Sequence, residues 1–161
     1  MAEKAEKKRT LELVDRAYRA KAWHGPALLE TLAGVTPAMA AKRVVKGAHT
    51  IWELVDHVAS WNAIVAERLA GRTPQVTPEL NFPKTPQPTA AAWRKSLARL
   101  ATSQRRFRAA VAKFPESQLG RIRPGTKTSW NVLLHGQMQH QLYHAGQIAL
   151  LRRGMDKAVK Q

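Results

Sequence analysis

The sequence predicts an all-α protein, a four-helix bundle with a long proline-rich crossover loop between helices two and three. Apolar residues recur at helical spacing in four long segments, and no alternating pattern long enough for a sheet strand occurs. Five prolines lie between the second and third segments. A long connection of this kind changes the order of the helices in a bundle.

Length and composition predict a single domain. The chain has 161 residues, of which 44% are hydrophobic, enough for one core. We assign residues 1–9 to a charged N-terminal tail, 10–154 to the bundle and 155–161 to a C-terminal tail. The absence of cysteine excludes a disulfide framework and a thiolate metal site. Because the start of the chain lacks the apolar stretch of a secretory signal, and no run approaches the ~18 apolar residues of a membrane span, we expect a cytoplasmic protein.

The first helix is predicted for residues 10–21, and its pattern resumes after Pro26. Proline lacks an amide hydrogen, so the helix should be broken near His24. Thr36 and Pro37 are typical of the start of a short connecting turn. The apolar stripe consists of Leu11, Val14, Tyr18, Leu28, Leu29 and Leu32.

The second helix is predicted to begin at Thr50 and to end at Gly71. Thr50 and Glu53 have the spacing of a capping box, in which each side chain binds the other's backbone N–H. The prolines between residues 71 and 88 exclude a regular element there and favour a long ordered loop.

The third helix is predicted for residues 89–113, with apolar residues on one side and arginines on the other. A connection containing Pro and Gly follows. The fourth helix should begin with Thr128 or Ser129 as its N-cap and end at Gly154. Three tryptophans fall on buried stripes and are interpreted as packing residues, namely Trp61, Trp93 and Trp130.

Three histidines are candidate metal ligands. His140 and His144 are four residues apart, so they share one face of the fourth helix. His57 falls on the apolar face of the second helix, where a core residue would otherwise be expected. The alternative is that all three are buried, hydrogen-bonded histidines without a metal. His24, His49 and His135 are assigned surface or capping roles.

Polar neighbours of these histidines are candidates for substrate contacts or for holding a ligand imidazole. Tyr143 and Gln147 share the face of His140 and His144. Core packing is an equally good interpretation of Tyr143. Glu53 lies one turn before His57, although it is also expected to pair with Thr50 in the capping box. Asp56 is interpreted as a solvated residue.

The formal net charge of +16 raises the question of a nucleic-acid partner. The basic residues are spread over the N-terminus, the third helix and the C-terminus, and no nucleic-acid-binding motif accompanies them. Specific nucleic-acid binding is therefore not expected, and neither is membrane binding.

The chain resembles the DinB-like (damage-inducible DinB and YfiT-like) superfamily of metal-dependent proteins. The matching segments are HTIWELVDHVASWNAIVAERLAG, TAAAWRKSLARL and SWNVLLHGQMQHQLYHAGQIALLRR, and the likeness extends from about Trp23 to Gly154. The string H-x-x-x-H-x-G-Q-I is the most specific part. Ala145 stands where many members carry a basic residue.

This resemblance implies a four-helix bundle, often a homodimer, with nickel or zinc held by a triad falling on His57, His140 and His144. Some members are transferases or isomerases that use low-molecular-weight thiols such as bacillithiol or mycothiol. We therefore expect a metal-dependent enzyme, a thiol-dependent transferase or a hydrolase acting on a small molecule. The alternatives are a non-enzymatic metal- or ligand-binding bundle and a basic nucleic-acid-binding protein.

A homodimer is also predicted from the apolar residues opposite the histidines. A bundle helix that is apolar on two sides needs a second surface to cover it. The alternative is that the crossover or the broken first helix covers these faces within one chain. The faces consist of Met138, Leu142, Ala145 and Ala149 on the fourth helix and Val55, Ala59 and Ala66 on the second.

Overall fold

The computed structural model describes residues 2–158 and is all-α. Seven α-helices and one short 3₁₀ helix occur in this range, which contains no β-strand. They are α1 (Ala2–Tyr18), α2 (Leu28–Leu32), α3 (Pro37–Ala41), α4 (Ile51–Leu69), α5 (Pro78–Asn81), α6 (Ala90–Lys113), η1 (Glu116–Gln118) and α7 (Trp130–Ala158).

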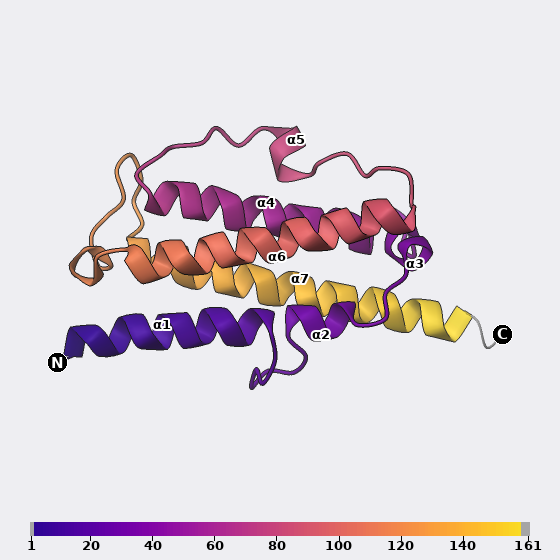
Figure 1. The fold of residues 1–161 in the computed structure, drawn as a ribbon, viewed down its shortest axis with the longest axis horizontal. Helices are drawn as coiled ribbons and strands as arrows, with labels where there is room; N and C mark the ends of the chain where they lie inside the picture. The colour runs from indigo at the N-terminus through magenta and orange to yellow at the C-terminus, as the bar shows by residue number, and fades with distance from the viewer. Residues whose placement is uncertain (1, 159–161) are drawn as a thin grey trace.

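Helix α4 packs against both α6 and α7 in a helical bundle, and α1 and α2 follow one another along it (Figure 1). The crossover that carries α5 runs the length of the bundle, so α4 and α6 point in the same direction. Helix α7 runs opposite to them. The predictions of an all-α class, of bundled helices and of a long crossover are confirmed.

The apolar core consists of two clusters. The first surrounds Trp52 and Leu100, and the second surrounds Phe107 and Leu134. Each of these four side chains is almost completely buried. Four buried amides lie on α4, α6 and α7 near the boundary of the two clusters, namely Asn62, Gln104, Gln137 and Gln141.

These four amides form one hydrogen-bonded layer. Asn62 Oδ1 accepts from Gln137 Nε2 at 2.8 Å and from Gln141 Nε2 at 2.7 Å. Gln104 Oε1 accepts from Gln141 Nε2 at 2.7 Å and from Asn62 Nδ2 at 3.0 Å. Because buried amides need these partners, the layer fixes the register of α4, α6 and α7.

Three predicted helix ends differ from the observed ones, both ends of the first helix and the C-terminal end of the last. Helix α1 begins at Ala2 and ends at Tyr18, so much of the predicted charged tail is helical. Helix α7 continues through Gly154, the predicted end, to Ala158. A Cβ atom on Gly154 would lie 3.1 Å from Val44 Cγ1, so this glycine permits a close approach to the helix and does not end it.

The crossover contains a regular element that the prolines were predicted to exclude. Helix α5 begins with Pro78 at its first position, where a missing amide hydrogen costs nothing. The Thr77 side chain caps it by accepting from Leu80 N. The capping box of Thr50 and Glu53 and the Ser129 cap of α7 are confirmed.

Asp56 is buried, contrary to the prediction that it is solvated. Arg99 Nη1 lies 3.2 Å from Asp56 Oδ1, and Ser96 Oγ donates to Asp56 Oδ2 at 3.2 Å. Helix α6 covers this part of α4 with a basic and a polar side chain, and the helical pattern of α4 alone could not show this. The carboxylate joins the two helices.

The two faces predicted to form a homodimer are largely covered within the chain, with Leu142 and Ala149 on α7 half-buried. Val14 packs in the same cluster as Met138, and Leu28 packs in the same cluster as Ala145. Val55 and Ala59 are also buried. The broken first helix thus covers much of this side of α7, as the alternative proposed, and the homodimer stays a prediction.

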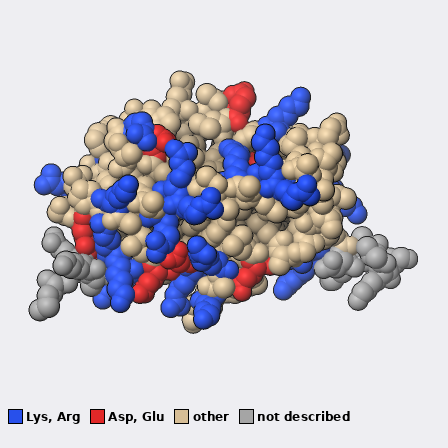
Figure 2. Space-filling view, in the orientation of Figure 1, with Lys and Arg blue, Asp and Glu red and all other residues tan. Residues whose placement is uncertain are grey.

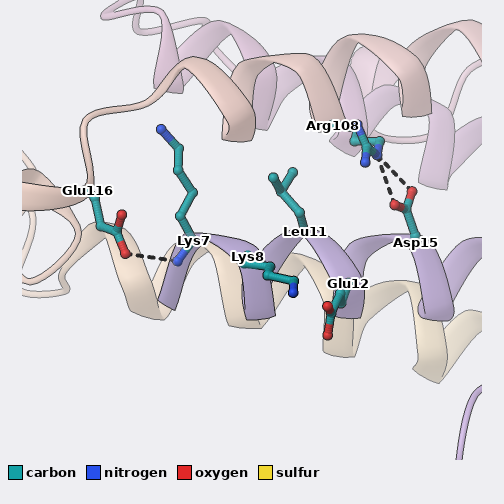
Figure 3. Close-up of a pocket in the computed structure, with 7 residues that line it drawn as sticks. All are labelled: Lys7, Lys8, Leu11, Glu12, Asp15, Arg108 and Glu116. Atoms are coloured by element: carbon teal, nitrogen blue, oxygen red, sulfur yellow. Dashed lines mark hydrogen bonds and ion pairs between the residues drawn. The ribbon is translucent and has the colours of Figure 1, made fainter. Parts of the chain in front are cut away.

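Lys and Arg side chains are spread over the whole face shown in Figure 2, with fewer Asp and Glu side chains among them. Some of these charges join helices: Arg108 on α6 binds both carboxylate oxygens of Asp15 on α1, each at 2.9 Å (Figure 3). Glu116 accepts from the backbone of Lys7 at 3.0 Å in the same hollow. Within residues 2–158, no helix is sufficiently long and apolar to span a membrane.

We expect Phe107→Ala to lower the free energy of unfolding by about 3–5 kcal/mol, because this ring is completely buried at the centre of one cluster. Chemical denaturation followed by circular dichroism measures the change. Arg94→Ala, on the exposed side of the same helix, should change stability little. Equal stabilities for the two variants would contradict the packing described here.

Candidate metal centre

His57 on α4 and His140 and His144 on α7 meet at one point. His140 Nε2 lies 2.9 Å from His57 Nε2 and 2.9 Å from His144 Nε2. One ligand nitrogen of each histidine lies within 4.8 Å of the others, an arrangement that could hold a metal ion. Because α4 and α7 are neighbours in the bundle, residues 83 positions apart in sequence come into contact.

Hydrogen bonds at the far nitrogens fix the tautomers of two of these imidazoles. His57 Nδ1 lies 2.8 Å from the backbone oxygen of Asn81, and His144 Nδ1 lies 2.6 Å from Gln147 Oε1. Since both partners are acceptors, each Nδ1 carries the hydrogen. The Nε2 atoms of His57 and His144 therefore present lone pairs toward His140.

His140 cannot satisfy this arrangement by itself. A neutral imidazole has one N–H, so His140 Nε2 can donate to only one of the two lone pairs in front of it at a time. Its own Nδ1 is buried and has no hydrogen-bond partner. A cation accepting a lone pair from each Nε2 removes the conflict among these three nitrogens and places the hydrogen of His140 on Nδ1, so the donor set fits a metal.

Burial keeps the three imidazoles neutral. It lowers the pKa of His57 to about 4 and that of His140 to about 3, with neighbouring histidines adding to the effect. Burial also lowers the pKa of His144, although the bond to Gln147 opposes this. All three are therefore unprotonated near pH 7, the form in which histidine binds metals.

Two of the three nitrogen separations, those from His140 to His57 and to His144, are close to those of a zinc site. Zinc–nitrogen bonds of ~2.0–2.1 Å in a tetrahedron separate two ligand nitrogens by about 3.3–3.4 Å. Small rotations of the imidazoles from 2.9 Å would reach this separation. Three protein ligands leave a fourth position open, as in catalytic zinc sites.

The crossover forms one wall of the site. Phe82, directly after α5, stacks on the His57 ring with centroids 4.1 Å apart and on His49 with centroids 3.9 Å apart. Trp61 Nε1 donates to Asn81 Oδ1 at 2.8 Å. The segment that holds His57 Nδ1 is thus fixed to α4 by aromatic stacking and by a second hydrogen bond.

The predicted neighbours of the triad have different positions. Gln147 contacts His144, and its role in holding a ligand imidazole stays a prediction. Glu53 contacts the Thr50 backbone and Arg43, and Asn81 takes the place beside His57 that was considered for Glu53. Tyr143 is 65% exposed, so core packing is excluded, and its ring lies 5.2 Å from that of His144.

The other three histidines lie away from the triad's nitrogens. His49 pairs with Glu53, and His24 and His135 line a hollow between α1 and α7. Trp93 is buried, while Trp61 and Trp130 are half-buried.

Sequence reasoning missed Asn81 and Phe82. The signal available was Thr77 followed by Pro78, a capping residue before a helix-starting proline. It predicts a short helix in the crossover, but not where the segment lies in space.

The match to a family model agrees with this geometry. The model of the DinB superfamily matches residues 22–148. The chain belongs to the DinB superfamily. The matched region contains all three histidines and the whole crossover. No curated protein and no solved structure is significantly similar to this DinB-superfamily chain.

A groove of about 530 Å³ opens beside the triad. His57 and His140 contribute to its lining, and Trp61 and Val132 give it apolar walls. Small-molecule sites commonly have this size and character. A ligand in this groove would contact the histidines that could hold a metal.

We expect Gln147→Leu to weaken metal binding about 10- to 100-fold, because His144 loses the acceptor that orients its ring. Competition with a chromophoric chelator measures the affinity for Zn²⁺. Gln139→Leu, exposed on the same helix, is the matched control and should bind like the wild type. A Gln147→Leu variant with wild-type affinity would show that this contact does not orient a ligand.

Proposed function

We propose that the protein is a metal-dependent enzyme in which His57, His140 and His144 hold Zn²⁺ or Ni²⁺. The observation that carries the proposal is the pair of Nε2 lone pairs, from His57 and His144, directed at His140 Nε2. Histidine nitrogens suit both metals. We also infer that α1 and α2 together make the fourth member of a four-helix bundle.

A metal in this position would lower the pKa of a bound water or hold a substrate thiol as its thiolate. Residues of the chain orient the ligand histidines and give the substrate access to them. Asn81 and Gln147 hold the imidazoles in the ligating tautomer, and Phe82 shields His57 from water. The groove gives a small molecule access to His57 and His140.

The proposed reactions are thiol-dependent group transfer and hydrolysis, with a low-molecular-weight thiol or another small molecule as substrate. The resemblance to thiol-using members of the superfamily favours transfer. A groove with apolar walls suits an organic substrate.

The test begins with elemental analysis of protein purified without a histidine tag. Metal-free protein is then loaded with Zn²⁺ or Ni²⁺ and assayed against a panel of thiols with electrophilic acceptors and a panel of esters and amides. Turnover that depends on the bound metal would support the proposal that the protein is a metal-dependent enzyme. Stoichiometric metal without turnover would favour a non-enzymatic metal-binding bundle, and salt-sensitive DNA retention unaffected by chelator would favour a nucleic-acid-binding protein.

We expect His140→Ala to lose stoichiometric metal and at least about 100-fold of any metal-dependent turnover, since one of three ligands is removed. His135→Ala, on the same helix but away from the triad, should keep both. Circular dichroism should show a folded helical protein in each case, because the core clusters do not include these histidines. Full metal content in His140→Ala would disprove the ligand assignment.

A further inference from the structure

The groove beside the triad also contains a cationic group. Arg123, from the connection between η1 and α7, lines the same groove as His57 and His140. Trp61, Val132 and other apolar residues form the rest of the wall. The groove therefore combines a neutral imidazole cluster, apolar surface and one guanidinium.

Arg123 has unused hydrogen-bonding capacity. Its Nη2 donates to Thr128 Oγ1 at 2.7 Å, but its Nε is buried and has no partner. Among the described side chains, no carboxylate forms an ion pair with it. A buried N–H without an acceptor is costly, so this group in a native structure calls for an explanation such as a bound water, ion or ligand.

A second guanidinium adds to the positive charge. Arg68 lies over the ring of Trp61, 5.6 Å from its centroid, and shares with Arg123 an adjoining hollow of about 330 Å³. Burial and the charge of Arg123 lower the pKa of Arg68. Arg72 nearby is neutralised by Glu67, whereas no described carboxylate pairs with Arg68.

The backbone holds Arg123 in place before any ligand arrives. Arg123 N donates to Thr128 O at 3.0 Å, and Thr126 N donates to Arg123 O at 3.1 Å. Ile122 and Ser129 form an isolated antiparallel bridge across the same turn. A group held in this way loses little freedom on binding a ligand.

We propose that Arg123, assisted by Arg68, binds the carboxylate of a small substrate with an apolar body whose reactive group reaches the histidine triad. A guanidinium fork matches a carboxylate with two parallel hydrogen bonds, and the apolar walls match the body. This inference rests on the proposed function, because the triad supplies the reactive end.

The first experiment uses metal-free protein. Calorimetry compares 4-phenylbutyrate with its neutral amide on the wild type, Arg123→Gln and the control Arg72→Gln. The wild type and Arg72→Gln should bind 4-phenylbutyrate more tightly than its amide. Arg123→Gln should bind 4-phenylbutyrate about 10- to 100-fold more weakly than the wild type does. Equal carboxylate affinity in wild type and Arg123→Gln overturns the proposal.

The second experiment uses cobalt-loaded protein and follows the thiolate-to-cobalt absorption band. 6-Mercaptohexanoate should bind the wild type more tightly than 6-mercaptohexanol, and Arg123→Gln should lose this preference without weaker binding of the alcohol. Retention of the preference in Arg123→Gln also overturns the proposal. Failure to take up cobalt would refute the proposed metal centre, while the metal-free titration still tests Arg123.

Arg123 also supports its turn, so the variants need a folding control. If circular dichroism shows that Arg123→Gln is unfolded, Arg123→Lys and Arg68→Gln replace it. Each should weaken 4-phenylbutyrate binding several-fold, because a lysine cannot form the two-point contact and Arg68 contributes only charge. Wild-type affinity in both variants overturns the proposal.

Discussion

The buried amide layer determines the relative positions of the helices that carry the histidines. Asn62 accepts from Gln137 and Gln141, and His140 lies between these two glutamines on α7. Any slip of α7 along α4 would leave several buried amides without partners, at a cost of about 1–3 kcal/mol for each. The apolar clusters on both sides are less directional, since Leu or Ile side chains can repack. Hydrogen bonds therefore set the alignment on which convergence of the three imidazoles depends.

The triad is a polar cluster with incomplete internal hydrogen bonding. Its outer contacts, from Asn81 and Gln147, are satisfied, whereas the three Nε2 atoms in its centre compete for too few hydrogens. Fully satisfied networks are usual in protein interiors, and exceptions tend to mark function. The protein thus retains a local conflict at the point where the groove meets the bundle.

The sequence predicted the features of the structure that depend on helical periodicity and residue spacing. The faces of α4 and α7 follow from residues at intervals of three and four, which is why His57, His140 and His144 could be named together. Asp56 was misread because its partner, Arg99, comes from another helix. Asn81, Phe82 and Arg123 were missed for a related reason: they lie in connections whose path depends on tertiary contacts. Gly154 shows a further limit, since the residue that stops many helices here allows close packing against Val44.

His57 is held by the main-chain oxygen of Asn81 and not by a side chain. Every residue type at position 81 carries such an oxygen, so a point substitution there leaves the acceptor in place. An insertion or deletion between residues 71 and 88 would instead move the acceptor away, because it alters the length of the span between α4 and α6. The orientation of this imidazole therefore depends directly on loop length, and on residue identity at position 81 only through the hydrogen bond from Trp61 that holds the segment.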